Sequence, residues 1–349
     1  MDEAKMQEFM MKALGDMGAT ATAPMILLGD RLGLYKAMAE LGPSSSEELA
    51  KKTGTFERYI REWVRSQAAA GYVSYEPKTE KYYLSDEQKM ALAVEDSPFF
   101  IPGAFQTMAA IFAAHDKLAE RFKSGQGLDW GEQHPLLFIG TERFFRPGYL
   151  AHLVSEWIPS LEGIEAKLKN GGKVADIGCG HGSSTILMAQ TYPKSQFVGF
   201  DYHAPSIAAA RERAAKAGVA ERARFEVAKS TDYPGEGYDL VAHFDCLHDM
   251  GDPVGAARRV KETLAKDGVW MIVEPRAGDK PEDNFNPIGR VFYAASTSIC
   301  VPASLAQNGP ALGAQAGEAK LREVLREGGF SKVRRAAETP FNIVLEARP

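Results

Sequence analysis

The chain of 349 residues is predicted to be an α/β protein, with a doubly wound parallel sheet in its C-terminal half and a smaller helical domain before it. From about residue 171 onward, apolar strands alternate with helical segments through short links, which is typical of a parallel sheet. Before residue 95, helical periodicity dominates and ends in a short hairpin pattern. The length also suits two domains better than one.

The N-terminal segment has the spacing of an amphipathic helix over its first 22 residues. Met6, Phe9, Met10 and Leu14 recur at helical intervals. Such a stripe has to be buried somewhere, and a partner subunit or its own chain would serve. We therefore expect a homodimer, and a separate second helix over residues 25–41.

Residues 44–84 have the pattern of a winged helix. Ser44, Ser45 and Ser46 precede Glu47 and Glu48, as at a helix start where acids favour the N-terminal dipole. A third helix is expected from near residue 55 to residue 71. Two short strands, at 72–75 and 81–84, then flank a turn, as in a wing.

A winged helix raises the hypothesis of a DNA-binding regulator. The third helix carries Arg58, Arg61 and Arg65 among glutamates, and the chain has a net charge of −5. Phosphate contacts need an excess of positive charge. A dimerisation or lid domain is favoured, and nucleic acid is not the expected partner.

The middle of the chain, residues 96–164, is expected to connect the domain of residues 1–95 to that of residues 165–349. It is rich in aromatic residues, and the run 140–149 is bounded by Gly and Pro, which indicates a loop. The longest weakly polar stretch, 99–114, is interrupted by Pro102 and Gly103 and is too short to span a bilayer. No secretory signal is recognised, and a cytoplasmic location is expected.

The C-terminal half alternates between strands and helices. A segment without regular structure is expected at 275–316, followed by a helix at 318–326. Two closing strands, 331–337 and 342–347, would pair as a hairpin at the edge of the sheet. The other strands are expected at 173–177, 196–201, 224–227, 238–246 and 269–274, and the other helices at 183–190, 205–217 and 252–268.

A glycine-rich loop follows the first of these strands in the sequence VADIGCGHG, residues 174–182. Gly178, Gly180 and Gly182 allow a tight turn and close approach of a ligand to the backbone. The spacing is GxGxG, and it lacks the GxGxxG of the dinucleotide fingerprint. Glycines alone would suit either a dinucleotide or another nucleoside.

Two acids distinguish the ligands. Asp176 lies two residues before the first glycine, where its charge would repel a pyrophosphate at the helix N-terminus but attract a cation. S-adenosylmethionine has no phosphate and carries an ammonium and a sulfonium. Asp201 ends the second strand, where a carboxylate can accept hydrogen bonds from both ribose hydroxyls. The loop and these acids favour S-adenosylmethionine over NAD.

Residues 165–349 resemble class I S-adenosylmethionine-dependent methyltransferases, whose first motif the glycine loop matches closely. The whole chain is similar to bacterial members with an N-terminal winged-helix domain, a layout shared with many small-molecule O-methyltransferases. The resemblance implies a Rossmann-like seven-stranded sheet with an antiparallel last strand. The family often has an acid after the third strand that contacts the adenine; here Ser230 or Asp232 would take its place. The expected cofactor-binding residues are Asp176, Gly178, Cys179, Gly180, Gly182, Asp201, Tyr202, Ser230, Phe244 and Asp245.

A general base is needed if the methyl acceptor is a hydroxyl or thiol. His248 follows the fourth strand at the carboxyl edge of the sheet, and its reference pKa of about 6.5 suits proton transfer at neutral pH. The triplet Leu-His-Asp resembles the motif that carries the catalytic histidine in such O-methyltransferases. Asp249 or Glu274 would orient the ring. Alternatively, His248 only packs against or caps the next helix.

The acceptor pocket is expected from the 138–149 loop and the segment 285–307. Their apolar side chains predict a hydrophobic or aromatic small molecule. The three cysteines show no metal-ligand spacing, so no metal site is expected. A binding protein without turnover remains a further alternative. The expected acceptor-pocket residues are Phe138, Phe145, Tyr149, Phe292 and Tyr293.

Overall fold

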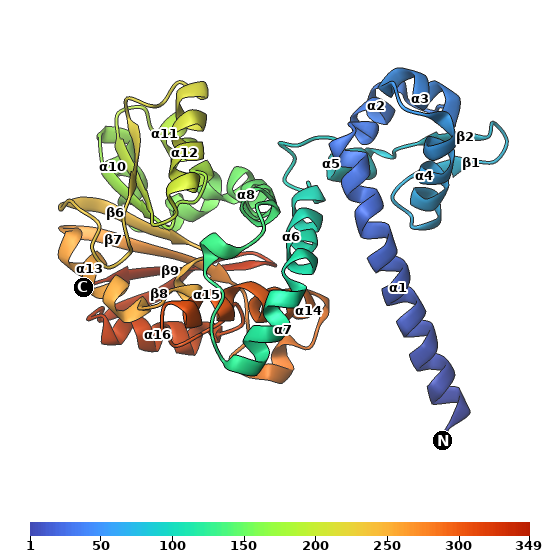
Figure 1. The fold of residues 1–349 in the computed structure, drawn as a ribbon. Coiled ribbons are helices and arrows are strands. Elements are labelled where there is room, and N and C mark those ends of the chain that lie inside the picture. The colour runs from blue at the N-terminus through green and yellow to red at the C-terminus, as the bar shows by residue number, and fades with distance from the viewer. The chain divides into compact units, whose positions relative to one another are not determined.

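The computed structural model describes residues 1–349, which divide into two compact units. The first unit contains residues 1–109 and 139–147, and the second contains residues 110–138 and 148–349 (Figure 1). The domain boundaries expected from the sequence, after residues 95 and 164, stay predictions. No helix is both long and apolar enough to cross a membrane.

The first unit begins with one long helix, α1 (Glu3–Arg31), so the expected break near residue 22 is wrong. Pro24 lies inside this helix and removes one backbone hydrogen bond without ending it. The chain turns instead at Gly33, whose φ of +67° is left-handed, and α2 (Leu34–Leu41) follows. A break thus falls where the backbone needs glycine.

The winged-helix pattern is confirmed within this unit. Ser45 caps α3 (Ser46–Thr53) in a reciprocal capping box with Glu48. The wing is antiparallel, and a β-bridge joins Ser44 to Tyr82. Buried apolar side chains of α1, α2, α3 and α4 (Glu57–Ala69) form the core, so these helices and the hairpin are one folded body. The wing consists of β1 (Ser74–Glu76) and β2 (Lys81–Tyr83), and helix α5 (Asp86–Leu92) follows it.

The expected loop at 140–149 is wrong, because α8 (Leu136–Gly148) is helical there and a π-helical turn, Tyr149–Trp157, continues it. Gly140 has a packing role in this helix. A Cβ at that position would lie 2.6 Å from the backbone nitrogen of Thr107 in α6 (Pro102–Ala113). The glycine that suggested a turn therefore permits close contact between helices.

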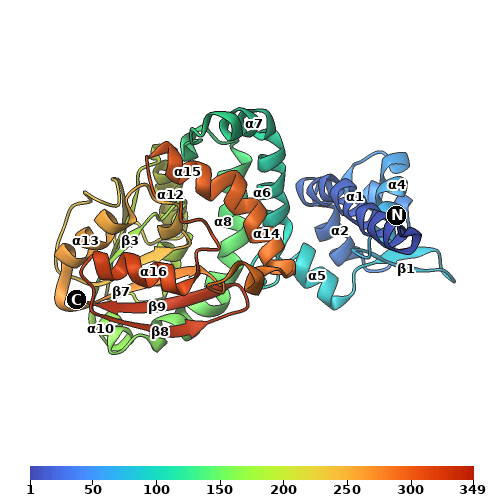
Figure 2. The ribbon, with the colours of Figure 1, turned by 90° about the horizontal axis from the view of Figure 1, so that it is seen from below.

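The second unit contains a seven-stranded sheet in the order β5-β4-β3-β6-β7-β9-β8. β9 is antiparallel to β7 and to β8 and lies between them (Figure 2). The predicted seven-stranded fold with an antiparallel last strand is confirmed. The strands are β3 (Lys173–Ile177), β4 (Gln196–Asp201), β5 (Ala223–Val227), β6 (Tyr238–Phe244), β7 (Leu264–Pro275), β8 (Lys332–Glu338) and β9 (Asn342–Arg348).

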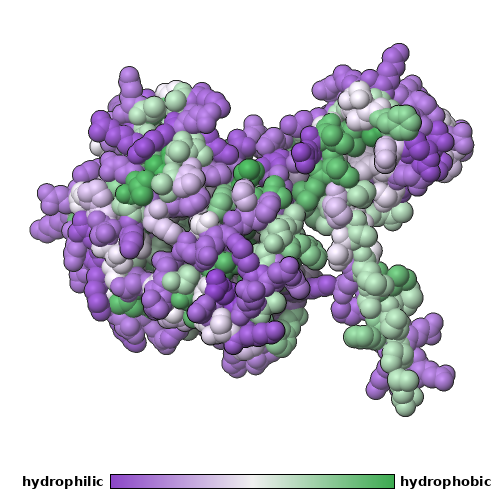
Figure 3. Space-filling view, in the orientation of Figure 1, coloured by the Kyte–Doolittle hydropathy of each residue, from purple (hydrophilic) through white to green (hydrophobic).

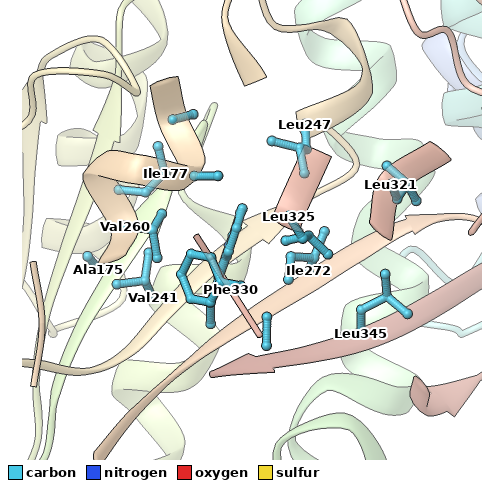
Figure 4. Packing of buried hydrophobic residues seen from close by; sticks show 14 of the residues in the cluster. Ala175, Ile177, Val241, Leu247, Val260, Ile272, Leu321, Leu325, Phe330 and Leu345 are labelled. Atoms are coloured by element: carbon cyan, nitrogen blue, oxygen red, sulfur yellow. The ribbon is translucent and has the colours of Figure 1, made fainter. Parts of the chain in front are cut away.

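Helices cover the sheet. Val260 of α13 (Pro253–Thr263) and Leu325 of α16 (Gly317–Glu327) pack over the strands in one apolar cluster (Figure 4). α11 (Ser183–Thr191) contacts β4, and α12 (Ala204–Lys216) contacts β5. α7 (His115–Ser124), α9 (Ile158–Ser160) and α10 (Ile164–Asn170) precede the sheet. The sheet is thus a rigid support whose strand ends carry the site.

Two further expectations in this unit are wrong. Much of 275–316 is helical, with α14 (Pro287–Ala295) capped by Asn286 and followed by a π-helical turn, Ser296–Cys300, and α15 (Val301–Ala306). The helix expected to reach residue 268 ends at Thr263, where β7 begins. Gly268 belongs to that strand, and it lies so close to β6 that a Cβ there would be 2.6 Å from the carbonyl oxygen of Tyr238.

Candidate active site

The glycine loop joins β3 to α11 and has three left-handed glycines. Gly178, Gly180 and Gly182 have φ values of +74°, +51° and +79°. The backbone nitrogens of Gly178 and Cys179 both donate to the carbonyl oxygen of Phe200 in β4, at 2.8 and 3.1 Å. The loop is therefore tied to the neighbouring strand and needs glycine at these positions.

Asp201, at the end of β4, accepts a hydrogen bond from the backbone of the glycine loop. Its Oδ2 accepts from the backbone nitrogen of Gly180 at 3.0 Å, and its Oδ1 accepts from that of His203 at 2.8 Å. Burial raises the pKa of this carboxyl, and the two backbone donors oppose that rise. The sequence suggested a ribose contact for Asp201, but its hold on Gly180 was missed.

Asp176 lies fully buried in β3 beneath the start of α11. Its Oδ2 accepts from the hydroxyls of Ser184 and Thr185, both at 2.6 Å. Its Oδ1 is buried without a hydrogen-bond partner. Burial raises the pKa of Asp176 to about 6. An unpaired buried carboxylate oxygen is costly, and a cationic or hydrogen-bonding ligand would offset that cost.

A second buried carboxylate lies at the end of β6. Asp245 has a left-handed backbone, with φ of +52°, and its Oδ1 accepts from the Nδ2 of Asn342 at 2.7 Å. Its Oδ2 has no hydrogen-bond partner, and burial raises its pKa well above the ordinary value. The ring of Phe244, beside it, lies 5.2 Å from that of Tyr149. Asp245 therefore presents a second unpaired oxygen at this edge of the sheet.

His248 lies in a 3-10 turn, Leu247–Asp249, and is oriented by Glu274 rather than by Asp249. Its Nδ1 is 2.5 Å from Oε2 of Glu274, and Oε1 of Glu274 accepts from the backbone nitrogen of Leu247 at 2.9 Å. On the other side of the ring, Nε2 is 3.3 Å from Sγ of Cys300. No local sequence pattern indicates Cys300 as a partner, because it lies 52 positions from His248.

Two opposing effects act on the pKa of His248. Burial disfavours the charged ring, but Glu274 and Cys300 favour it, and the pKa of His248 is raised well above its ordinary value. Burial also raises the pKa of Asp249 to about 7, although the charge of His248 opposes this. A histidine with a raised pKa is a stronger base once it is neutral.

The remaining expected cofactor-binding residues have fewer contacts that indicate a role. Tyr202 directly follows Asp201 and is 39% exposed. Cys179 is buried. Ser230 is half-buried, whereas Asp232 is exposed and accepts from the backbone nitrogen of Lys229 at 3.1 Å. The adenine contact therefore stays a prediction with both candidates open.

The structure brings together some of the expected acceptor-pocket residues. Phe292 is buried in a cluster against which Phe138 packs, and the ring of Phe138 lies 4.6 Å from that of His203. Tyr293 is half-buried in α14, and Tyr149 lies beside Phe244. Phe145 belongs to the other unit. Their role in binding an acceptor stays a prediction.

Comparison with known proteins agrees with this geometry. Residues 168–329 match the family model of a methyltransferase domain, and residues 20–93 match that of an Rv2258c-like winged HTH domain. The chain thus has a methyltransferase domain that follows an N-terminal winged-helix domain, the order that the sequence predicts.

Curated relatives match over part of their length. Trans-aconitate 2-methyltransferase of Paracidovorax citrulli is 33% identical over 31% of this chain and 40% of its own. The 27-O-demethylrifamycin SV methyltransferase of Amycolatopsis mediterranei is 33% identical over 29% of this chain and 38% of its own. The chain therefore spans well under half the length of these relatives.

Solved structures match over nearly the full length. Human N-acetylserotonin methyltransferase in complex with S-adenosylmethionine has a TM-score of 0.67 at 17% identity, covering 100% of this chain and 98% of its own. An O-methyltransferase family protein of Burkholderia thailandensis has a TM-score of 0.70 at 14% identity, covering 97% and 98%. At these identities the likeness concerns the fold.

Proposed function

We propose that the protein is an S-adenosylmethionine-dependent methyltransferase of a small-molecule acceptor. One observation carries this proposal: Asp176 presents a buried, unpaired carboxylate oxygen beneath a loop of left-handed glycines. The methyltransferase-domain match supports the proposal, as do relatives named methyltransferases and a structural neighbour bound to S-adenosylmethionine.

The charged residues at the glycine loop fit this cofactor better than they fit a dinucleotide. Two carboxylates, the fully buried Asp176 and the half-buried Asp201, lie at the loop, and neither is paired with a basic side chain. They would repel a pyrophosphate and attract an ammonium or sulfonium. When bound, S-adenosylmethionine supplies a methyl group already activated by its sulfonium. Asp176 and the glycines would hold its methionine end, Asp201 its ribose, and Ser230 or Asp232 its adenine.

His248 is proposed as the general base. Glu274 fixes the ring through Nδ1 and would stabilise the imidazolium that forms when Nε2 takes a proton from an acceptor hydroxyl. Alignment of the acceptor with the methyl group would supply most of the remaining rate enhancement. Proton removal by a positioned base contributes about 10²–10⁴-fold.

The acceptor is proposed to be an apolar or aromatic hydroxyl compound. Phe138 and Phe292 are apolar and Tyr149 and Tyr293 are amphipathic, and aromatic side chains of this kind line small-molecule sites.

A homodimer in the cytoplasm is part of the proposal. Met6, Phe9, Met10 and Leu14 are 41–65% exposed along α1, where green marks hydrophobic residues (Figure 3). Burying this stripe against a second copy would remove apolar surface from water.

A DNA-binding regulator is the second candidate, and the charges on α4 disfavour it. Arg58 is 2.7 Å from Glu62, and Arg61 is 2.7 Å from Glu57. Arg65 also lies within 3.7 Å of Glu62. Each arginine that would face phosphate already faces a carboxylate, so little excess positive charge remains for counterion release.

The experiment is methyl transfer from radiolabelled S-adenosylmethionine to a panel of hydroxylated aromatic compounds. We expect label in at least one extracted product, and a loss of about 10²-fold or more in kcat with His248→Ala while cofactor affinity is kept. Glu212→Ala, on the exposed face of α12, is the control. Product formed equally well without His248 would remove the base assignment, and label in no product of a panel widened to thiols and amines would contradict the enzyme.

A further inference from the structure

We propose that His248, Asp249 and Cys300 form a binding site for a single zinc ion, with Glu274 holding the histidine ring. The potential ligand atoms of these three residues all lie within 4.8 Å of one another. They offer one imidazole nitrogen, one carboxylate oxygen and one sulfur. No part of the methyl-transfer proposal needs this combination.

The distances suit a tetrahedral ion. Nε2 of His248 lies 3.3 Å from Sγ of Cys300. Zinc bonds of about 2.1 Å to nitrogen and 2.3 Å to sulfur place those two atoms about 3.6 Å apart at the tetrahedral angle. The imidazole and the thiol therefore have nearly the spacing that zinc requires. The Asp249 carboxylate oxygen lies within 4.8 Å of both and would move closer as the ion binds.

The surroundings of His248 match those of a zinc-binding histidine. Such a residue usually donates its other ring N–H to a carboxylate, which fixes the ring and raises its basicity. Glu274 supplies that carboxylate at 2.5 Å from Nδ1, and both side chains are at most 4% exposed. This arrangement directs Nε2 toward Cys300 and leaves it available as a ligand.

The ligand types favour zinc among divalent ions. Mixed nitrogen, sulfur and oxygen donors suit this borderline metal, whereas calcium and magnesium prefer oxygen alone. Cys300 binds as a thiolate, so its proton leaves to solvent as the zinc–sulfur bond forms. Three protein ligands leave a fourth position open for water. Cys300 lies in the π-helical turn far along the chain, which is why ligand spacing in the sequence does not indicate the site.

Zinc in this site would inhibit methyl transfer, because the ion occupies the nitrogen that takes the acceptor proton. This consequence rests on the proposed function, whereas the binding itself does not. Zinc binding is measured without S-adenosylmethionine, and methyl transfer is measured with a chelator present. Failure of one proposal is therefore distinguishable from failure of the other.

The test is competition for Zn²⁺ between the full-length protein and a chromophoric chelator, with Co²⁺ as a spectroscopic probe. We expect one ion per chain and a thiolate-to-cobalt absorption band. Cys300→Ala should abolish the band. Because it removes a ligand itself, it should weaken zinc binding by more than the loss of a residue that only hydrogen-bonds a ligand, which costs about 10–100-fold. Glu274→Gln should weaken it by about 10–100-fold.

The matched control is Cys179→Ala, which removes a buried thiol of the glycine loop and should leave the cobalt band intact. Cys300→Ser keeps the side-chain volume and replaces the alanine variant if circular dichroism shows that the latter is unfolded. The proposal is overturned if the wild type binds no zinc at micromolar concentration. It is equally overturned if the cobalt band survives loss of Cys300.

Discussion

Nδ1 of His248 lies 2.5 Å from Oε2 of Glu274, and the two side chains are buried together at the carboxyl edge of the sheet. The carboxylate comes from the end of β7 and the ring from the turn after β6, so two adjacent parallel strands position the pair. Ligands of open α/β sheets bind at this edge.

The first prediction concerns the pH dependence of methyl transfer. The base must be neutral, so activity is lost as pH falls through the pKa of His248, which lies above 6.5 in the folded protein. Glu274→Gln removes the charge that supports the imidazolium, so we expect a lower maximal kcat/KM and an acidic limb displaced to lower pH. A kcat/KM profile that is the same in both proteins would show that Glu274 does not tune the base.

The second prediction concerns cofactor affinity and Asp176. Its carboxyl has a pKa of about 6, raised by burial, and a cationic ligand favours the ionised form. We expect affinity for S-adenosylmethionine to fall by up to about tenfold per pH unit below pH 6. Calorimetry from pH 5 to pH 8 measures this, with Asp176→Asn expected to bind more weakly and without that pH dependence. An equally steep dependence in the variant would assign the proton to another group.

The elements predicted from the sequence are those encoded by neighbouring residues. The glycine loop, Asp201 at a strand end and the order of the strands along the chain follow from local spacing, and the structure confirms them, although β7 begins at Leu264 rather than at residue 269. The loop predicted at 140–149 is wrong because a glycine in a helix–helix contact, such as Gly140, cannot be told from a turn glycine by its neighbours in the sequence. Cys300 beside His248 and Asn342 beside Asp245 are contacts made only by the fold, 52 and 97 positions apart.

The third prediction concerns acid stability and His243. This residue is fully buried, accepts from the indole nitrogen of Trp270 at 2.9 Å, and has a pKa lowered by burial to about 3. Below pH 6.5 the unfolded chain takes up a proton that the folded chain does not, so stability is lost as pH falls. The loss is at most about 1.4 kcal/mol per pH unit.

His243→Gln keeps a hydrogen-bond acceptor for Trp270 and cannot titrate. Urea unfolding at pH 6.5 and pH 5 should show a free energy of unfolding that falls by about 1–2 kcal/mol more in the wild type than in the variant. An equal decrease of the free energy of unfolding in both proteins would mean that His243 is not the buried neutral group described above.

The fourth prediction concerns the winged-helix domain. Because Arg58, Arg61 and Arg65 lie next to glutamates, we expect the full-length protein to pass through heparin at physiological salt and to leave duplex DNA unshifted at micromolar concentration. Glu57→Gln with Glu62→Gln should increase retention on heparin by removing the paired carboxylates. Specific binding of the wild type to duplex DNA would favour the regulator.

We propose that the glycine loop and its two acids, Asp176 and Asp201, bind S-adenosylmethionine. Calorimetric titration of the purified chain with S-adenosylmethionine and, separately, with NAD tests it directly. We expect one S-adenosylmethionine per chain, no heat from NAD, and binding weakened at least about tenfold by Asp201→Ala, which removes two hydrogen bonds to the loop and its turn. The Glu212→Ala control should bind like the wild type. Binding of NAD with no binding of S-adenosylmethionine would instead identify the loop as a dinucleotide site.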